Sequence, residues 1–195
     1  MKFNRRSFLT ILLLIVVAIV VYLLAKPSKS SPEINQPQTT ATTPSISTKH
    51  PSAWTEQPIY DDSEKSQGVV IKLQRSDPTA FLLVRSLETS GDDQLDLKSI
   101  SDGIVASLKE QSSDFSLIST STSKIKGFDT VEINYSQPEA DNKTENKLIV
   151  VPLSNKTYYL NYKVKDASLK GLDSEMESIT EDILARIDKN GNIGS

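Results

Sequence analysis

The stretch "TYYLNYKVK" (residues 157–165) places two different sets of side chains alternately along nine residues. One set is aromatic or aliphatic and the other also contains polar and charged groups: Tyr158, Leu160, Tyr162 and Val164 against Tyr159, Asn161 and Lys163. Because successive side chains of a β-strand point to opposite faces, this alternation predicts a strand with one apolar face. Such a strand needs neighbouring strands and a layer that covers its apolar face.

Five segments earlier in the chain also carry strand-like patterns, separated by turn signals such as "SDPT" (76–79). Pro152, in the last of them, indicates a strand end or a sheet edge, because proline cannot donate a ladder hydrogen bond. The predicted strands are "GVVIKLQR" (68–75), "AFLLVRSL" (80–87), "FSLISTSTS" (115–123), "GFDTVEINYS" (127–136) and "NKLIVVPLS" (146–154).

Two segments carry helical spacing instead, each with one apolar stripe and one charged face. Asp96 is the predicted N-cap of the first, and the second covers residues 168–188. The stripes are Leu97, Ile100, Ile104 and Leu108, and then Leu169, Leu172, Met176, Ile179, Ile183 and Ile187. Consecutive strands joined by short turns, together with these helices, predict an α+β domain over residues 50–188. Its expected architecture is an antiparallel sheet flanked by helices.

The segment "FLTILLLIVVAIVVYLLA" (8–25) is uncharged and almost wholly apolar. As a helix it spans roughly 27 Å, close to the hydrocarbon thickness of about 30 Å, so it is predicted to cross the membrane. Arg5 and Arg6 precede it, which favours residues 1–7 in the cytoplasm and the domain outside the cell membrane. The alternative is a cleaved signal peptide, including twin-arginine export through "RRSFL" (5–9); both place the domain outside the cytoplasm.

Residues 26–49 are rich in Pro, Ser and Thr and are predicted to form a disordered linker. Residues 1–49 hold six basic residues and one acidic residue, which leaves 16 basic and 24 acidic residues afterwards, a net charge of −8. Such a domain repels nucleic acid, so no nucleic-acid partner is expected. The chain has no cysteine, which excludes disulfides, thiolate metal sites and a lipid-modified cysteine.

The opening "HPSAW" (50–54), a hairpin, a helix, a meander and a closing helix together resemble the PsbP-like family. The resemblance is carried by Pro51, Ser52 and Trp54 and by the aromatic strand Tyr158–Tyr162, and it covers residues 50–188. It implies an antiparallel sheet flanked by helices, usually without enzymatic activity. Bacterial relatives are often membrane-anchored or lipoprotein domains. No residue of this chain matches a photosynthetic docking or ion site.

The only tryptophan and the only histidine of the chain both lie in this opening stretch. Trp54 is predicted to anchor the first strand in the core, the alternative being an exposed aromatic that grips a ligand. His50 is predicted to be a solvated junction residue. Without a second histidine or a cysteine it cannot assemble a typical zinc site.

No catalytic motif, cofactor-binding motif or phosphate loop occurs, so no catalytic, cofactor or metal residue is assigned. The acidic clusters "DDSE" (61–64) and "GDDQLD" (91–96) are predicted to lie in turns as solvated charge, with calcium binding as the alternative. The acids on the last helix are expected to keep normal pKa values. The candidate calcium ligands are Asp92, Asp93 and Asp96, and Asp188, Asn190 and Asn192; the helix acids are Glu175, Glu177, Glu181 and Asp182.

These patterns predict a non-catalytic, membrane-tethered, extracytoplasmic binding or accessory domain, with residues 189–195 as a frayed tail. Its expected partners are the membrane, through the N-terminal helix, and a membrane-proximal protein or cell-envelope ligand. The surfaces expected to bind are the sheet edge near Pro152 and the face that bears Tyr159. The alternative is a hydrolase-like enzyme that acts on envelope material through carboxylates.

Overall fold

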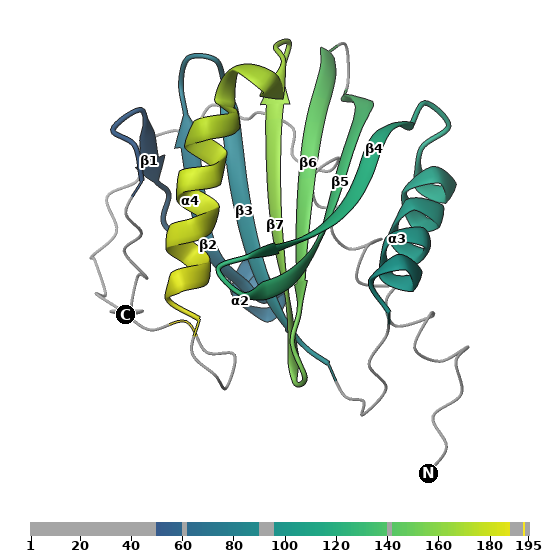
Figure 1. Ribbon diagram of the computed structural model, residues 1–195. Helices are drawn as coiled ribbons and strands as arrows, with labels where there is room; N and C mark the ends of the chain where they lie inside the picture. The colour runs from purple at the N-terminus through teal and green to yellow at the C-terminus, as the bar shows by residue number, and fades with distance from the viewer. Residues whose placement is uncertain (1–49, 60–61, 90–95, 140–141, 188–192, 194–195) are drawn as a thin grey trace.

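The computed structural model describes residues 50–59, 62–89, 96–139, 142–187 and 193. Over these residues the chain forms a seven-stranded antiparallel sheet with helices on both faces (Figure 1), which confirms the predicted α+β class. The predicted membrane span 8–25 and the predicted linker 26–49 lie outside the described residues. Within the described part, no helix combines the length and the apolar character needed to cross a bilayer.

The strand order is β1-β2-β3-β7-β6-β5-β4, so β7 lies in the middle of the sheet. The strands are β1 (Trp54–Glu56), β2 (Val69–Arg75), β3 (Ala80–Glu88), β4 (Ser116–Ile125), β5 (Phe128–Glu139), β6 (Asn142–Pro152) and β7 (Lys156–Lys165). The helices are α2 (Asp62–Ser66), α3 (Leu97–Gln111), the 3-10 turn η1 (Leu169–Leu172) and α4 (Asp173–Ala185).

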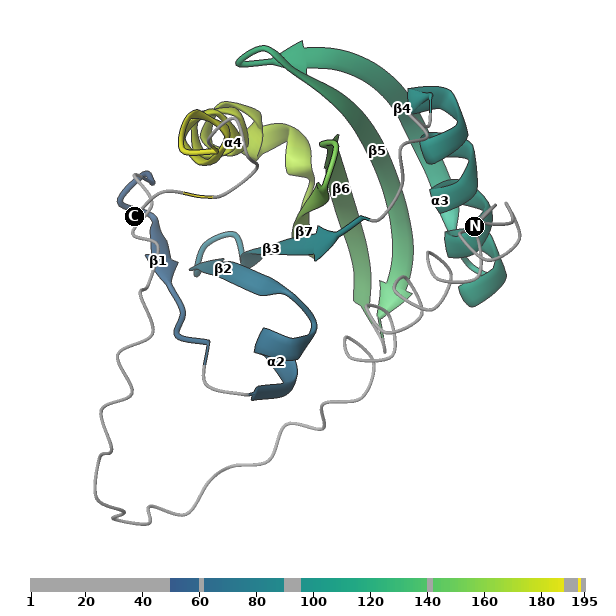
Figure 2. The ribbon, with the colours of Figure 1, turned by 90° about the horizontal axis from the view of Figure 1, so that it is seen from below.

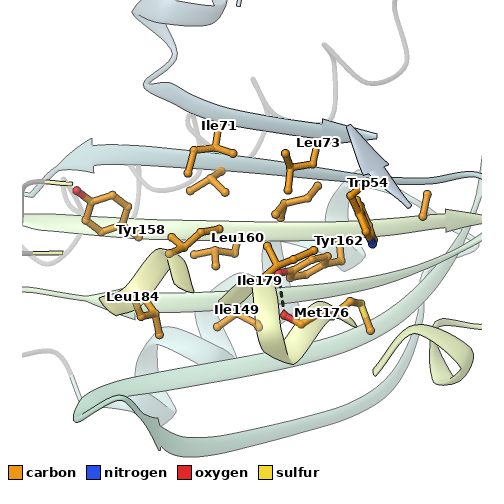
Figure 3. Close-up of a cluster of buried hydrophobic side chains, with 14 of the residues drawn as sticks. Trp54, Ile71, Leu73, Ile149, Tyr158, Leu160, Tyr162, Met176, Ile179 and Leu184 are labelled. Atoms are coloured by element: carbon orange, nitrogen blue, oxygen red, sulfur yellow. Dashed lines mark hydrogen bonds between the residues drawn. The ribbon is translucent and has the colours of Figure 1, made fainter. Parts of the chain in front are cut away.

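The apolar face of β7 forms the main core of the domain together with α4 (Figure 3). Tyr162 is fully buried, and its hydroxyl bonds to the Met176 carbonyl at 3.1 Å and to the Thr180 hydroxyl at 2.8 Å. Burial raises the pKa of Tyr162 far above its ordinary value. This core cluster also includes Ile71, Leu73, Leu82, Val84, Tyr158, Leu160, Ile179, Ile183 and Leu184.

A second, smaller core lies on the opposite face of the sheet, beneath α3. The predicted N-cap Asp96 is confirmed, because its carboxylate accepts the backbone N–H of Ser99 at 2.9 Å. The hydrogen bonds from Ser99 lower the pKa of Asp96. The buried members of this second cluster are Ile104, Leu108, Val131, Ile133, Tyr135, Val150 and Tyr159. The sheet is therefore covered by helices on two sides.

The hairpin of β4 and β5 extends past the sheet and arches over α4 (Figure 2). Its turn consists of Lys126 and Gly127, both with positive φ (52° and 87°), as a tight two-residue hairpin turn requires. Ile125 and Phe128 beside the turn are half-buried against the main core. The ammonium of Lys126 lies 2.8 Å from the carboxylate of Glu181 on α4. The tip of the hairpin therefore contacts the helix by packing and by one ion pair.

Three details differ from the sequence-based expectations. The segment 168–188 is not one helix, since it begins as η1 and α4 ends at Ala185. The expected tail is not wholly frayed, because Ile193 forms a β-bridge with Ile187 and packs on the main core. Asp62 to Glu64, expected in a turn, lie in α2. A five-residue helix is too short to produce an amphipathic pattern, so its sequence resembled a loop.

Candidate functional site

Trp54 joins the short strand β1 to the main core. Its side chain is 2% exposed, and its ring meets that of Tyr162 edge-on at 6.3 Å between centroids. The indole Nε1–H donates to the Glu175 carboxylate at 2.6 Å. Arg75 donates to the same carboxylate through Nε at 3.0 Å and Nη2 at 3.3 Å. The predicted role of Trp54 as a core anchor is confirmed, and His50 lies half-buried at the start of the described chain.

Glu175 does not keep the normal pKa that its place on an outer helix suggested. Its partial burial acts to raise the pKa, but the hydrogen bonds from Arg75 and Trp54 and the charge of Arg75 outweigh that effect. The result is a pKa below the ordinary value. Sequence periodicity missed this because the partners lie 100 and 121 residues away. The carboxylate is held ionised by neighbours that fasten β1 and β2 to α4, which is a structural role.

The other candidate acids do not converge. Glu181 pairs with Lys126, and Asp182 pairs with Arg186, the residue that caps the end of α4, at 3.0 Å. Glu64, in the cluster expected to be solvated, is buried at 3% exposure and bonds Lys72 at 2.8 Å. Among the described residues, no group of three or more potential ligands could hold a metal ion. Five of the six proposed calcium ligands lie outside the described residues: Asp92, Asp93, Asp188, Asn190 and Asn192.

Of the two surfaces expected to bind a partner, the one near Pro152 is not a sheet edge, and on the other face Tyr159 itself is buried. Pro152 ends β6, which lies inside the sheet between β5 and β7, so only the strand-end alternative was right. A proline is tolerated there because the terminal residue of a strand need not donate to the ladder. Tyr159 is 6% exposed in the core beneath α3, and burial raises its pKa to about 12.

A different part of that sheet face is accessible, and we call it the open sheet face: Phe81, Leu83, Leu148 and Asn161, all half-buried. The pairings Leu83↔Asn161 and Leu148↔Asn161 place these side chains beside one another on β3, β7 and β6. On this side α3 packs on β4 and β5, while α2 packs on β2. Figure 2 shows β3 and β7 between those two helices, with no described helix over them on the side opposite α4.

Two observations set the open sheet face apart from ordinary surface. Neither Phe81 nor Leu83 belongs to the two core clusters that the described residues form. The Oδ1 atoms of Asn161 and of the neighbouring buried Asn146 have no hydrogen-bond partner among the described residues. Buried amide oxygens are normally satisfied. The surface therefore offers apolar contact, which suits a partner that carries apolar groups, and the two amide oxygens that no described residue satisfies are buried beneath it.

The sequence did contain a signal for this surface. In "AFLLVRSL" (80–87) apolar residues occupy both alternating sets, so β3 has no polar face over Phe81 to Val84. Such continuous runs are typical of strands covered on both faces. One face of β3 is covered by α4 through Leu82 and Val84, and the other carries Phe81 and Leu83.

The arrangement of an antiparallel sheet between helices defines a PsbP-like α+β domain. The solution structure of the cyanobacterial PsbP protein CyanoP from Synechocystis sp. PCC 6803 matches it with a TM-score of 0.51 and 15% identity, over 68% of this chain and 82% of that one. LpqN of Mycobacterium tuberculosis, described as involved in cell envelope biogenesis, matches with a TM-score of 0.48 and 14% identity, over 70% and 78%. At these identities the likeness concerns the fold.

The family itself follows from the sequence. The profile of the Lpp-LpqN family, described as "Probable lipoprotein LpqN", matches residues 22–189, so the chain belongs to this family. No curated protein matches the chain at a significant level.

Proposed function

We propose that the protein is a membrane-tethered accessory domain of the cell envelope that binds a membrane-proximal protein through its open sheet face and performs no catalysis. The observation that carries the proposal is the pair Phe81 and Leu83, two large apolar side chains on a half-exposed sheet surface outside both core clusters. Apolar side chains gathered on a surface with polar surroundings are typical of protein-binding sites.

Membership of a family described as a probable lipoprotein supports a place at the membrane. This chain contains no cysteine, so no residue of it can carry a cysteine-linked lipid. The uncharged segment 8–25 offers another anchor, with residues 1–7 in the cytoplasm and the domain outside. A linker over residues 26–49 then keeps the domain close to the membrane. That raises its effective concentration for a partner in the same membrane.

The contacts of the acidic residues support a binding role over catalysis. Catalysis by carboxylates needs two acids in one cleft with pKa values pushed apart. Here Glu175 binds Arg75 and Trp54, while Glu181 pairs with Lys126 at the other end of the helix. The two acids therefore fasten different parts of the sheet to α4, β2 with β1 and the β4–β5 turn, and they are six positions apart on the helix.

A photo-crosslinking amino acid placed at residue 83 in native cells tests the binding surface. We expect a single adduct of defined mass that does not form when the same group replaces Glu177, which is exposed on α4 on the other side of the sheet. Phe81→Asp should weaken the adduct without shifting the emission of Trp54, which reports on folding. Equal labelling from positions 83 and 177, or no adduct, would contradict the proposal.

Two further measurements address the tether and the absence of catalysis. Protease added to intact spheroplasts should digest the domain; full protection excludes the proposed topology.

Glu177→Gln, Glu181→Gln and Asp182→Asn should each leave the cellular phenotype intact. If one of them abolished the phenotype while folding and adduct formation were unchanged, the protein would be an enzyme.

A further inference from the structure

The outer edge of the sheet suggests a second interaction, independent of the function proposed above. We propose that β4 pairs with β4 of a second copy of the chain, so that two seven-stranded sheets form one continuous antiparallel sheet across a twofold axis. In this arrangement Ser121 lies on the axis, and Thr120 of one copy lies opposite Thr122 of the other.

The edge formed by β4 is long and accessible. The strand runs for ten residues, pairs only with β5, and is exposed at every residue except Ile125. Exposed sheet edges template pairing with another chain, and proteins usually blunt them with proline, charge or very short strands. Residues 116–123 contain no proline and no charged side chain. A bulge at Ile118 is the single feature of this kind, and it leaves residues 119–125 regular.

The opposite edge shows what a protected edge looks like in the same sheet. There β1 has only three residues, of which Trp54 is buried and Glu56 carries charge. Besides being long, the β4 edge carries Leu117 and Ile118, which are 39% and 57% exposed. They are the large hydrophobic side chains that stand out as exposed in the described part of the chain. A long edge that carries two exposed apolar side chains and no charge over residues 116–123 is the feature that calls for an occupant.

The lack of charge favours a second copy over a strand of another protein. In a twofold antiparallel pair, residues near the axis meet their own copies, and like charges placed opposite each other destabilise a sheet. A self-pairing strand must therefore be neutral at its centre, whereas a strand that pairs with a different protein could use complementary charge. Ser119 to Ser123 meet this requirement. In this register Lys124, which pairs with Asp129 at 2.8 Å, lies opposite the uncharged Ile118 of the other copy, so no like charges meet.

The alternation of β4 is also compatible with this register. Thr120 and Thr122 pair with Ile133 and Val131 of β5, and therefore lie on the same side of the sheet as α3, although both are exposed. Rotation about an axis normal to the sheet keeps each face on its own side. The threonines of the two copies then meet one another, and Thr–Thr pairs stabilise neighbouring strands.

Cysteine substitution tests the pairing directly, because the chain has no cysteine of its own. Residues opposite each other in an antiparallel pair have Cα atoms about 4.5–5.5 Å apart, within the range of roughly 4.4–6.8 Å that a disulfide needs. We expect the full chain with Ser121→Cys, in membranes under mild oxidation, to form a disulfide-linked dimer. The matched control is Thr55→Cys on β1, exposed at the opposite edge.

Register is tested by mixing two variants. Ser119 lies opposite Ser123 of the other copy, so co-expressed Ser119→Cys and Ser123→Cys should cross-link. Neither variant should form a disulfide by itself, because the two copies of the same residue lie roughly 13 Å apart along the paired strands. Dimer yield several-fold above the Thr55→Cys control, with the mixed pair exceeding each single variant, supports the proposal. The proposal is overturned if Ser121→Cys and Thr55→Cys give equal yields of disulfide-linked dimer, or if the mixed pair yields no more dimer than each single variant. It is also overturned if the only cross-links that form are to another protein.

Discussion

The two ends of the sheet are built by different means. At the β1 end, a strand of three residues is fastened by a buried tryptophan, a carboxylate and an arginine to α4. At the β4 end, a strand of ten residues lies almost wholly exposed and depends on backbone pairing with β5. Figure 1 shows both ends, with α4 in front of the sheet. The same helix contacts both through Glu175 and Glu181.

The difference shows that strand length and strand fastening are separate properties. A short strand can close a sheet when one large side chain fills a space in the core, since burial of a large aromatic group is worth several kcal/mol. A long strand can instead remain stable through its ladder and leave its outer edge available. Side-chain substitutions should therefore be costly at the β1 end and mild at the β4 end.

The largest effect is expected from Trp54→Ala. The change opens a cavity beside Tyr162 and leaves Glu175 without its indole donor. Large aromatic-to-alanine changes in cores typically cost about 3–5 kcal/mol of the free energy of unfolding. Urea unfolding of the full chain in mild detergent, followed by circular dichroism, measures it. The control is Leu117→Ala, which should cost less than about 1 kcal/mol because this side chain is 39% exposed. Equal losses of unfolding free energy in Trp54→Ala and Leu117→Ala would contradict the contrast between the two ends of the sheet.

Glu175→Gln should have the next largest effect. An amide keeps the shape of the side chain but replaces charge-assisted hydrogen bonds to Arg75 and Trp54 by weaker ones. A loss of about 1–3 kcal/mol in the free energy of unfolding is expected, in the range for hydrogen bonds to charged groups. Trp54 emission should change as the indole loses its short contact at 2.6 Å. A variant with unchanged stability and emission would show that the network does not fasten β1.

The same carboxylate predicts a dependence of stability on pH. The pKa of Glu175 is lower in the folded than in the unfolded state, so the folded state binds its proton less tightly. Its contribution is fully present above the unfolded-state pKa and is lost as pH falls through the lowered folded-state pKa. Unfolding measured from neutral to acidic pH should show this loss in the parent chain. The loss should be smaller in Glu175→Gln, and identical profiles would contradict the assignment.

Much of this architecture could be predicted from local pattern. The two-residue alternation of β7 and the stripe of Ile179 and Ile183 predicted one strand and one helix, and both contribute to the main core. The strand and the helix depend on near neighbours in sequence, which periodicity reports. Trp54 was predicted to anchor the core from the opening stretch that resembles the PsbP-like family, and it is buried.

The remaining features depend on residues that the chain brings together over long distances. Tyr159 and Asn161 share one alternating set in β7, yet α3 covers the first and leaves the second half-exposed. The position of α3 on the sheet decides this difference, and no local pattern encodes it. The partners of Glu175 and the strand order that puts β6 inside the sheet are likewise non-local. The open sheet face therefore emerged from the structure, although the apolar run in β3 was visible beforehand.

The smallest effect is expected from Glu181→Gln, the same substitution on the same helix at the other end of the sheet. Its partner Lys126 is 2.8 Å away, but the two side chains are 46% and 41% exposed. Exposed ion pairs contribute about 0–1 kcal/mol because water and salt screen them. The hairpin tip also keeps the packing of Ile125 and Phe128, which the substitution does not touch. We expect Glu181→Gln to lower the free energy of unfolding by an amount within that range, and the difference to disappear at high salt. The same unfolding experiment as for Glu175→Gln measures it. A loss as large as that of Glu175→Gln would mean that the β4 end depends on its side chains as much as the β1 end does.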